Sequence, residues 1–322
     1  MESKNQKQNI FQHPLVLTLA ALLCCALWGS ATPAIKTASA LLIREADKGV
    51  PSTILFAGIR FAFAGLITVV IYSIARRKFL YPRLENLPRV AAVGAFQTVI
   101  QYIFFYVGLS YTTGVKGTIA SGTSAFFSVL VASLIFRQEK LTAKKIVACV
   151  LGFAGIIIIN VSGLEFTMNI GDAFVIISAI SLAVSSVLIK KFSKYEDPVV
   201  ISGYQFIIGG TFLVVLGLIL GGKMSFDSTT GVIILVYLAF LSAVAYALWG
   251  VLLKYNPVSK ITVFSFTTPV FGTVLSLLFL PEHSGVNPIN LVITLLLVSG
   301  GIFLLNYQKK APEGKIPEIS EK

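Results

Sequence analysis

The sequence predicts an all-α integral membrane protein whose ten transmembrane helices form two five-helix inverted repeats. The first observation behind this prediction is composition: 56% of the 322 residues are hydrophobic and only 12% are charged, whereas soluble domains carry roughly 25% charge. The second is a succession of ten long apolar segments, and the third is a weak similarity between the two halves of the chain. A soluble fold of this length cannot bury so much apolar surface.

The apolar segments set the number of helices. Most are close to the ~20 residues that a spanning helix needs. Nine contain no charged residue, and the second contains only Arg60. In chain order the segments are 14–35, 50–75, 90–115, 117–136, 146–164, 173–189, 198–222, 228–253, 261–281 and 284–308.

The two halves share polar landmarks as well as apolar ones. Residues 57–65, AGIRFAFAG, align with residues 202–210, SGYQFIIGG, so that Arg60 matches Gln205. Further matched pairs are Tyr102 with Tyr246, Lys36 with Lys190, and GIIIIN (155–160) with GIFLLN (301–306). Because each half holds an odd number of helices, the second copy enters the membrane in the opposite direction, as in many secondary transporters. The predicted parts are a tail 1–13, repeats 14–161 and 168–308, and a tail 309–322.

The distribution of positive charge predicts the orientation. Twenty of the 26 lysines and arginines fall on the side of the amino terminus, and four, Arg44, Lys48, Lys116 and Lys223, fall in loops on the other side. Since loops rich in Lys and Arg stay cytoplasmic, we expect a multi-pass protein of the plasma membrane with both termini in the cytoplasm.

The net charge of +12 follows from this topology. The partners expected of the basic loops are therefore anionic membrane lipids, and a nucleic acid is not expected. The three cysteines, Cys24, Cys25 and Cys149, lie in apolar segments and show no disulfide or zinc spacing. We expect no metal and no cofactor, and a monomer or a homodimer.

An ordered set of motifs resembles one family. The motifs are WGSATPAIK (28–36), IRFAFAG (59–65), GLSYTTGVKG (108–117), Glu139 after the fourth helix, SGYQFIIGG (202–210) and SFTTPVFGTVLSLLFLPE (265–282). Over residues 14–308 the chain resembles the EamA family of the drug/metabolite transporter superfamily. The resemblance implies a ten-helix basket whose central cavity is lined by helices 1, 3, 4, 6, 8 and 9, with helices 5 and 10 outside. It also implies transport of small metabolites.

Two features depart from the family pattern. Ala125 stands in the fourth helix where the family commonly has a proline, as in the TTPVF stretch of the second half. The sixth helix lacks an aromatic residue that matches Trp28. The two halves are therefore expected to flex unequally.

Two basic residues lie inside the predicted helices, where a charge is expensive and often functional. Lys36 either binds the carboxylate or phosphate of a substrate or extends to the outer lipid headgroups. Arg60 either faces the cavity and binds an anion or bonds to neighbouring helices, and its uncharged counterpart Gln205 favours the second role.

The other candidate site residues are aromatic, hydroxylated or proline. Trp28, Tyr102, Tyr246 and Trp249 fall toward the middle of their segments, where they either line a pocket or fill the core. Thr123, Ser124 and Thr268 either bond to substrate or hold helices together. Pro33 and Pro269 interrupt helical hydrogen bonding and are candidate gating residues.

These observations favour a secondary transporter over other classes of membrane protein. The expected function is export of amino acids or related carboxylated or zwitterionic metabolites by alternating access between the inverted repeats. The alternative within transport is uptake or exchange of sugar-type or phosphorylated metabolites. A membrane enzyme or a scaffold leaves the repeat unexplained, and the sequence has no catalytic constellation. No acidic residue or histidine lies in the middle of a helix, so we expect no obligatory proton coupling.

Overall fold

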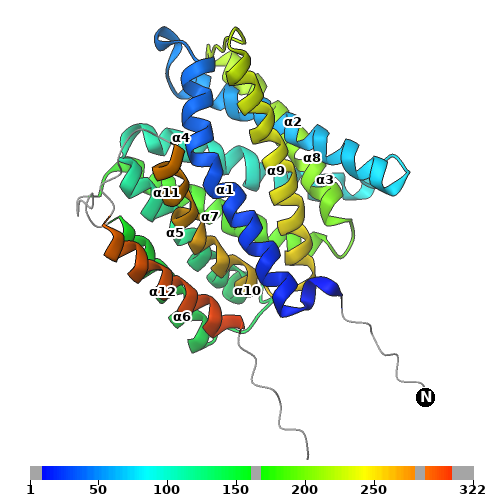
Figure 1. The fold of residues 1–322 in the computed structure, drawn as a ribbon. Helices are drawn as coiled ribbons and strands as arrows, with labels where there is room; N and C mark the ends of the chain where they lie inside the picture. The colour runs from blue at the N-terminus through cyan, green and yellow to red at the C-terminus, as the bar shows by residue number, and fades with distance from the viewer. Residues whose placement is uncertain (1–8, 161–167, 280–286, 307–322) are drawn as a thin grey trace, which may run out of the picture.

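A computed structural model describes residues 9–160, 168–279 and 287–306. Throughout these residues the secondary structure is helical, without a strand (Figure 1). Nine helical spans in the described part are long and apolar enough to cross a membrane. A tenth, α6 (Ala143–Ile159), has 17 residues, so the predicted count of ten spanning helices holds. The predicted tail 309–322 and the junction of the repeats at 161–167 lie outside the described residues.

The first repeat contains five spans. The first, second and fifth spans are the single helices α1 (Pro14–Leu42), α2 (Val50–Arg76) and α6. The third span consists of α3 (Leu87–Gly94), a π-helical stretch (Ala95–Ile100) and α4 (Gln101–Tyr111). The fourth span consists of α5 (Gly114–Leu130) and a π-helical stretch (Val131–Ile135). Short 3-10 turns at Ile10–Gln12, Glu45–Asp47 and Leu84–Asn86 precede three of these spans. Prolines stand in the first turn of α1, α2 and α3, where their missing N–H has no helical partner to lose.

The second repeat also contains five spans. The sixth, seventh, eighth and tenth spans are the single helices α7 (Ile170–Phe192), α8 (Pro198–Ile219), α9 (Thr229–Tyr255) and α12 (Pro288–Asn306). The ninth span consists of α10 (Val258–Thr262), a 3-10 stretch (Val263–Thr267) and α11 (Thr268–Phe279). The side chains of Asn169, Asp197 and Ser228 cap α7, α8 and α9 by accepting backbone N–H groups.

Contacts between the repeats follow an approximate two-fold symmetry. The α2–α8 and α6–α12 pairs each join a span to its own counterpart in the other repeat. Packing of α1 on α9 is matched by packing of α7 on α4, and packing of α1 on α11 is matched by packing of α7 on α5. The repeats are therefore interleaved, so that each helix of one half packs on helices of the other (Figure 1).

The α2–α8 crossing depends on glycine. A Cβ atom placed on Gly65 would lie 2.5 Å from the carbonyl oxygen of Gly203, and one on Gly210 would lie 2.4 Å from the backbone nitrogen of Ala62. Small residues allow this backbone-to-backbone packing inside a membrane. The matched motifs AGIRFAFAG and SGYQFIIGG thus place two counterpart helices against each other at the symmetry axis.

Helices α6 and α12 form a pair at one side of the bundle (Figure 1). Gly155 of α6 accepts a hydrogen bond from Thr294 Oγ1 at 2.9 Å, and a Cβ atom on Gly301 would lie 2.7 Å from the carbonyl oxygen of Ala148. This pairing uses Gly155 and Gly301 for packing within the chain, and it places the fifth and tenth spans outside the central helices, as the resemblance implied.

The two ends of the bundle carry different loops. At the termini end, where the first described turn and the end of α12 lie (Figure 1), the backbone N–H of Arg83 donates to Glu196 Oε2 at 3.0 Å. At the opposite end, Arg44 forms an ion pair with Asp227 at 3.1 Å. The two contacts are related by the symmetry of the fold, because each joins the loop after the first span of one repeat to the loop after the second span of the other.

Three details differ from the sequence-based expectation or add to it. Lys116, which was expected in a loop, lies in the first turn of α5 because Thr113 caps that helix. The third and fourth spans both contain π-helical stretches that the apolar pattern does not signal. The fourth span runs as one α-helix through Ala125, whereas the ninth consists of three pieces, the last of which begins one residue before Pro269.

Candidate substrate-binding site

Arg60 is the central charged residue of the bundle. It is 2% exposed, and its Nε and Nη2 donate to Ser242 Oγ of α9 at 3.1 and 2.9 Å. The Ser242 hydroxyl in turn donates to the carbonyl of Leu238 at 2.8 Å. The guanidinium carbon lies 4.8 Å from the centroid of the Phe61 ring. Within the described residues no ion pair joins Arg60 to a carboxylate.

A cluster of aromatic side chains surrounds this arginine. Its members, called here the aromatic cluster, are Trp28, Phe61, Tyr102, Tyr106, Phe206, Tyr246 and Trp249. The hydroxyl oxygens of Tyr102 and Tyr246 lie 3.0 Å apart. Arg60 is close enough for its charge to act on the hydroxyl groups of Tyr102, Tyr106 and Tyr246. The cluster thus combines an apolar wall with one buried positive charge.

Two pairs in the cluster join matched positions of the two repeats. Phe61 stacks on its counterpart Phe206 with ring centroids 5.0 Å apart and an interplanar angle of 13°. Tyr102 contacts its counterpart Tyr246 through the two hydroxyl groups. Counterparts can touch only near the symmetry axis, so the axis passes through the aromatic cluster, the place where repeat-built carriers hold their substrates.

Trp28 brings an unsatisfied donor to the cluster. Its ring packs edge-on against Tyr246 and Trp249, with centroids 5.1 and 4.9 Å apart. Its Nε1–H group is buried and has no hydrogen-bond partner. A buried donor without a partner carries a free-energy cost, which an acceptor atom of a bound molecule would remove.

Gln205 occupies the position that matches Arg60, but it has a different environment. It is fully buried, and its Oε1 accepts a hydrogen bond of 2.7 Å from Thr98 Oγ1 in the π-helical stretch of the third span. Its Nε2 has no hydrogen-bond partner. Gln205 therefore holds two spans together and leaves one amide donor unused.

The hydroxyl candidates do not form one group. Thr123 Oγ1 donates to the carbonyl of Ala120 at 2.5 Å within α5. Ser124 is buried, and its carbonyl accepts from Ser128 Oγ. On α11 the hydroxyl of Thr268 is buried without a partner. No hydrogen bond joins these described residues to one another, and the Thr268 hydroxyl is a buried polar group that the fold leaves unused.

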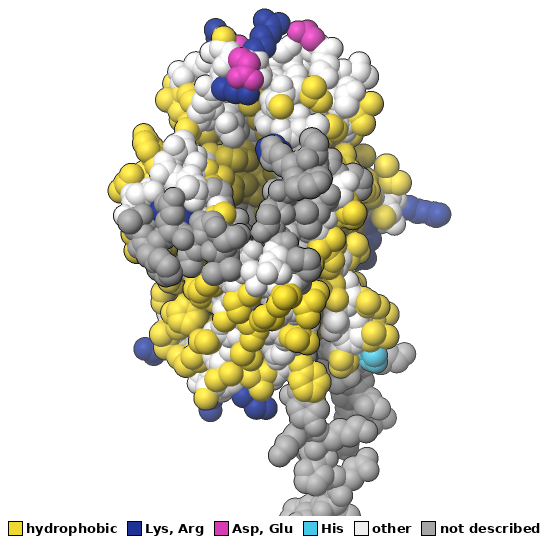
Figure 2. Space-filling view, turned by 60° about the vertical axis from the view of Figure 1, so that its left-hand side comes forward, with side chains coloured by type: hydrophobic (Ala, Val, Ile, Leu, Met, Phe, Trp, Pro, Cys, Tyr) yellow, Lys and Arg dark blue, Asp and Glu magenta, His cyan; other side chains and the backbone are white. Residues whose placement is uncertain are grey.

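Lys36 lies outside the aromatic cluster. It is exposed on α1, about 12 Å along the helix axis from Trp28 toward the opposite end. Thr32, one turn before it, is also exposed. A space-filling view shows a hollow in one face of the molecule, lined by hydrophobic side chains and with a basic side chain at its edge (Figure 2).

The two gating candidates differ in their local structure. Pro33 is buried within the continuous helix α1, and its carbonyl accepts from Thr37 Oγ1 at 3.0 Å. Pro269 is the second residue of α11, directly after the 3-10 stretch. A helix start tolerates proline without losing a hydrogen bond, so the break in the ninth span accommodates Pro269.

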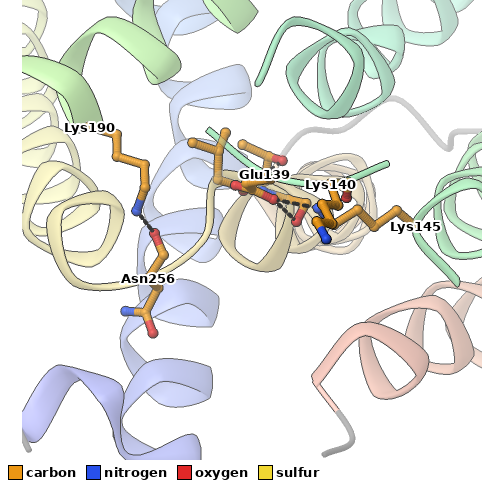
Figure 3. Close-up of polar contacts among 8 residues, drawn as sticks. Glu139, Lys140, Lys145, Lys190 and Asn256 are labelled. Carbon is orange, nitrogen blue, oxygen red and sulfur yellow. Dashed lines mark hydrogen bonds and ion pairs between the residues drawn. The ribbon is translucent and has the colours of Figure 1, made fainter. Parts of the chain in front are cut away.

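A polar network joins the repeats at the termini end (Figure 3). Glu139, in the loop between α5 and α6, accepts from Lys145 Nζ at 2.8 Å and from the hydroxyl and backbone N–H of Ser259 in α10. Lys190 of α7 donates to the carbonyls of Leu253 and Asn256. Burial opposes ionisation of Glu139, but the hydrogen bonds from Lys145 and Ser259 outweigh it and lower its pKa.

Several of these residues were missed from the sequence. Ser242, the partner of Arg60, and Thr98, the partner of Gln205, look like ordinary small residues in apolar segments. The stacked pair Phe61 and Phe206 was visible only as two aligned positions in the repeat. That alignment was the one available signal, because it marks residues that can meet on the axis.

The described residues contain no group of three side chains suited to a metal ion. The thiols of Cys24 and Cys25 donate to the backbone carbonyls of Ala245 and Phe264 at 3.4 and 3.2 Å. The candidate site thus offers a cation, hydrogen-bond donors and aromatic faces, which are groups suited to binding a small molecule.

Comparison with known proteins identifies relatives over the whole bundle. The model of the EamA-like transporter family matches residues 16–161 and again residues 169–307. The chain is 28% identical to "Uncharacterized transporter YvbV" of Bacillus subtilis, covering 84% of this chain and 87% of that protein. It is 26% identical to an "Uncharacterized transporter" of Archaeoglobus fulgidus, covering 79% and 87%.

Two other similarities are more limited. The "WAT1-related protein At3g02690, chloroplastic" of Arabidopsis thaliana is 27% identical over 66% of this chain, which spans only about half (52%) of that protein. A protein of known crystal structure superposes with a TM-score of 0.71 at 20% identity, covering 89% of this chain and 95% of the other, and it supports the fold alone. Because the family model matches both halves, the chain belongs to the EamA-like transporter family and is a multi-pass membrane transporter.

Proposed function

We propose that this transporter exports amino acids or related carboxylated or zwitterionic metabolites across the plasma membrane. The observation that carries this proposal is the burial of Arg60 without an acidic partner in the described part of the chain. A buried guanidinium bonded only to a serine hydroxyl keeps most of its desolvation cost. A substrate carboxylate would supply the missing negative charge through paired hydrogen bonds.

The neighbouring groups support a substrate with a small apolar or aromatic body. The aromatic cluster supplies ring faces, and the unused donors Trp28 Nε1–H and Gln205 Nε2 supply hydrogen bonds to oxygen atoms. Binding sites commonly combine apolar walls with a few polar groups that fix orientation. The buried hydroxyl of Thr268 in the ninth span also has no partner.

Alternating access is the mechanism we infer. At the termini end the Glu139–Ser259 contact joins the two repeats, and Lys190 ties α7 to the end of α9 within the second repeat, whereas a hollow opens elsewhere in the surface (Figures 2 and 3). The excess of basic residues at the termini end favours its cytoplasmic location. On this proposal the present conformation is closed toward the cytoplasm, and the interleaved repeats rock about the axis through the aromatic cluster.

Export from cells that overproduce the protein tests this function. Extracellular and intracellular metabolites are compared for the wild type, Arg60→Gln and Arg60→Lys at matched membrane expression. We expect carboxylated metabolites to leave faster with the wild type, and Arg60→Gln to reduce that flux about tenfold to hundredfold, because it removes charge-assisted hydrogen bonds. Arg60→Lys should retain part of the flux, since it keeps the charge but not the bidentate geometry.

Arg44→Gln is the matched control, because Arg44 pairs with Asp227 at the surface of the opposite end. It should leave the flux unchanged. Full activity of Arg60→Gln would contradict a binding role for the arginine. Transport of phosphorylated or sugar-type compounds would replace carboxylated metabolites with the alternative substrate class. Inward transport would replace export with uptake.

A further inference from the structure

A pocket that shares no residue with the aromatic cluster lies at the termini end of the fourth span. It has a volume of about 500 Å³ and is formed by the π-helical stretch Val131–Ile135 and the loop that follows it. The pocket is more than a loop surface, because it combines unpartnered buried polar atoms, basic side chains and exposed apolar side chains.

Two polar atoms of the pocket have no partner in the protein. Ser133 is 9% exposed, and its hydroxyl is buried without a hydrogen bond. Gln138 donates through Nε2 to the carbonyl of Val187 at 3.2 Å, which orients the amide and leaves its buried Oε1 without a donor. The pocket therefore offers one hydroxyl donor and one amide acceptor in fixed positions, both of which cost free energy while unpaired.

The charged side chains of the pocket are positive overall. Arg137 and Lys140 are exposed at its rim, and neither forms an ion pair in the described part of the chain. Glu139 also borders the pocket, but its carboxylate is held by Lys145 and Ser259 (Figure 3). The carboxylate is thereby neutralised locally, so an anion that enters the pocket meets two free cations.

The same pocket has an apolar side. Leu134 is 57% exposed and Ile135 is 70% exposed, and Leu141 lies at the other edge with 36% exposure. At the end of a transmembrane span such side chains contact lipid acyl chains, and basic residues beside them lie at headgroup depth. A ligand that satisfies every feature has a phosphate, a further hydrogen-bond donor and an acyl chain.

We propose that this pocket is a specific site for an anionic phospholipid whose headgroup carries a hydroxyl donor, as the glycerol headgroup of phosphatidylglycerol does. The phosphate binds Arg137, Lys140 and the Ser133 hydroxyl. A headgroup hydroxyl donates to Gln138 Oε1, and the acyl chains pack on Leu134 and Leu141. The bound lipid lies on the same loop as Glu139, so it stabilises the loop whose Glu139 contacts Ser259 of the other repeat.

The test measures lipid binding to the purified full-length protein in neutral detergent, by native mass spectrometry and by the thermal unfolding midpoint. Dioleoylphosphatidylglycerol should bind at least tenfold more strongly than dioleoylphosphatidylcholine. Arg137→Gln and Lys140→Gln should each weaken the phosphatidylglycerol complex roughly fivefold, the effect of one basic residue beside an anionic lipid. Ser133→Ala should weaken it as well, while the lipid-free midpoint stays the same or rises, because the variant removes an unpaired buried hydroxyl.

Two controls match these variants. Arg77→Gln changes another exposed arginine with the same left-handed backbone, φ 51° at both positions, and should not alter the affinity. Ser128→Ala removes a buried hydroxyl that already has a partner in the same helix. Equal binding of the two lipids, or equal losses in Arg77→Gln and Arg137→Gln, would overturn the proposal. Competition by glycerol phosphate as strong as that of the lipid would assign the pocket to a soluble phosphate compound instead.

Discussion

Arg60 and Gln205 occupy matching positions in the two repeats but have different partners. Arg60 bonds to Ser242 across the α2–α9 contact, and Gln205 bonds to Thr98 across the contact of α8 with the third span. The symmetry of the fold thus presents a cation on one side of the axis and a neutral amide on the other. This asymmetry agrees with the substrate proposed above, which has one anionic end.

Trp28 gives a prediction at the residue scale. Trp28→Phe keeps an aromatic ring against Tyr246 and Trp249 but removes the unpartnered buried N–H group. We expect about a fivefold loss of substrate affinity, the value of one neutral hydrogen bond, with little change in the thermal unfolding midpoint. Trp249→Phe trims a neighbouring ring of the same aromatic cluster to the same extent, and it measures how much of any loss comes from packing alone. A loss of stability in Trp28→Phe with unchanged transport would show that Trp28 only fills the core.

At the scale of elements, the spans of the two repeats differ in regularity although their order is the same. The third and fourth spans contain π-helical stretches, whereas the ninth contains a 3-10 stretch before Pro269. Such irregular turns redirect side chains and often occur at functional sites. Here they hold Thr98 against Gln205 and Ser133 in the lipid pocket.

The α2–α8 crossing gives a prediction at the same scale. Gly65→Ala places a Cβ atom 2.5 Å from the backbone oxygen of Gly203, where no flexible side chain can move aside. We expect a destabilisation of about 1–3 kcal/mol, typical of overpacking, seen as a lower unfolding midpoint in detergent. Gly300→Ala is the control, since nothing lies within 4 Å of its Cβ position and alanine favours a helix. A Gly65→Ala protein as stable as the wild type would contradict the observed packing of α2 on α8.

For the whole molecule, the termini end is fastened by charged groups of both repeats. Glu139 of the first repeat binds Ser259 of the second, and Lys190 binds the loop after α9 (Figure 3). At the opposite end, contacts such as the Arg44–Asp227 pair lie in solvent and contribute little. At the termini end the Glu139–Ser259 contact is thus a buried polar link between the repeats, and a conformational change that opens this end must break it. In the described part of the opposite end, the buried Asp172 of the second repeat accepts a hydrogen bond from Thr112 of the first.

The buried carboxylate predicts how stability depends on pH. The folded state lowers the pKa of Glu139 relative to its ordinary value of 4.5, so its contribution is present above that pH and is lost as the pH falls through the lower folded value. Glu139→Gln should lower the thermal unfolding midpoint at pH 7 and should show a smaller further loss than the wild type below about pH 4.5. Glu45→Gln, which alters an exposed pair with Lys48, is the control. Parallel acid profiles for wild type and Glu139→Gln would contradict this role.

The sequence by itself determined the membrane class, the ten spans, the internal repeat and the family. These properties depend on summed apolar length, on charge distribution and on ordered motifs, which are local quantities along the chain. The repeat alignment also brought Arg60, Tyr102, Gln205 and Tyr246 forward as candidates. It could not distinguish an anion-binding arginine from one that joins helices.

Only the tertiary structure decided which candidates meet. It placed Arg60, Trp28, Tyr102, Tyr246 and Trp249 in one cluster on the symmetry axis, and it put Lys36 about two helical turns away. It also supplied the partners Ser242, Thr98 and Ser259, whose residue types carry no signal in an apolar or loop segment. The reason is physical: a hydrogen bond between helices depends on crossing points and helix rotation, and these are set by packing across the whole bundle, with glycine contacts and π-helical turns that the hydropathy pattern does not encode.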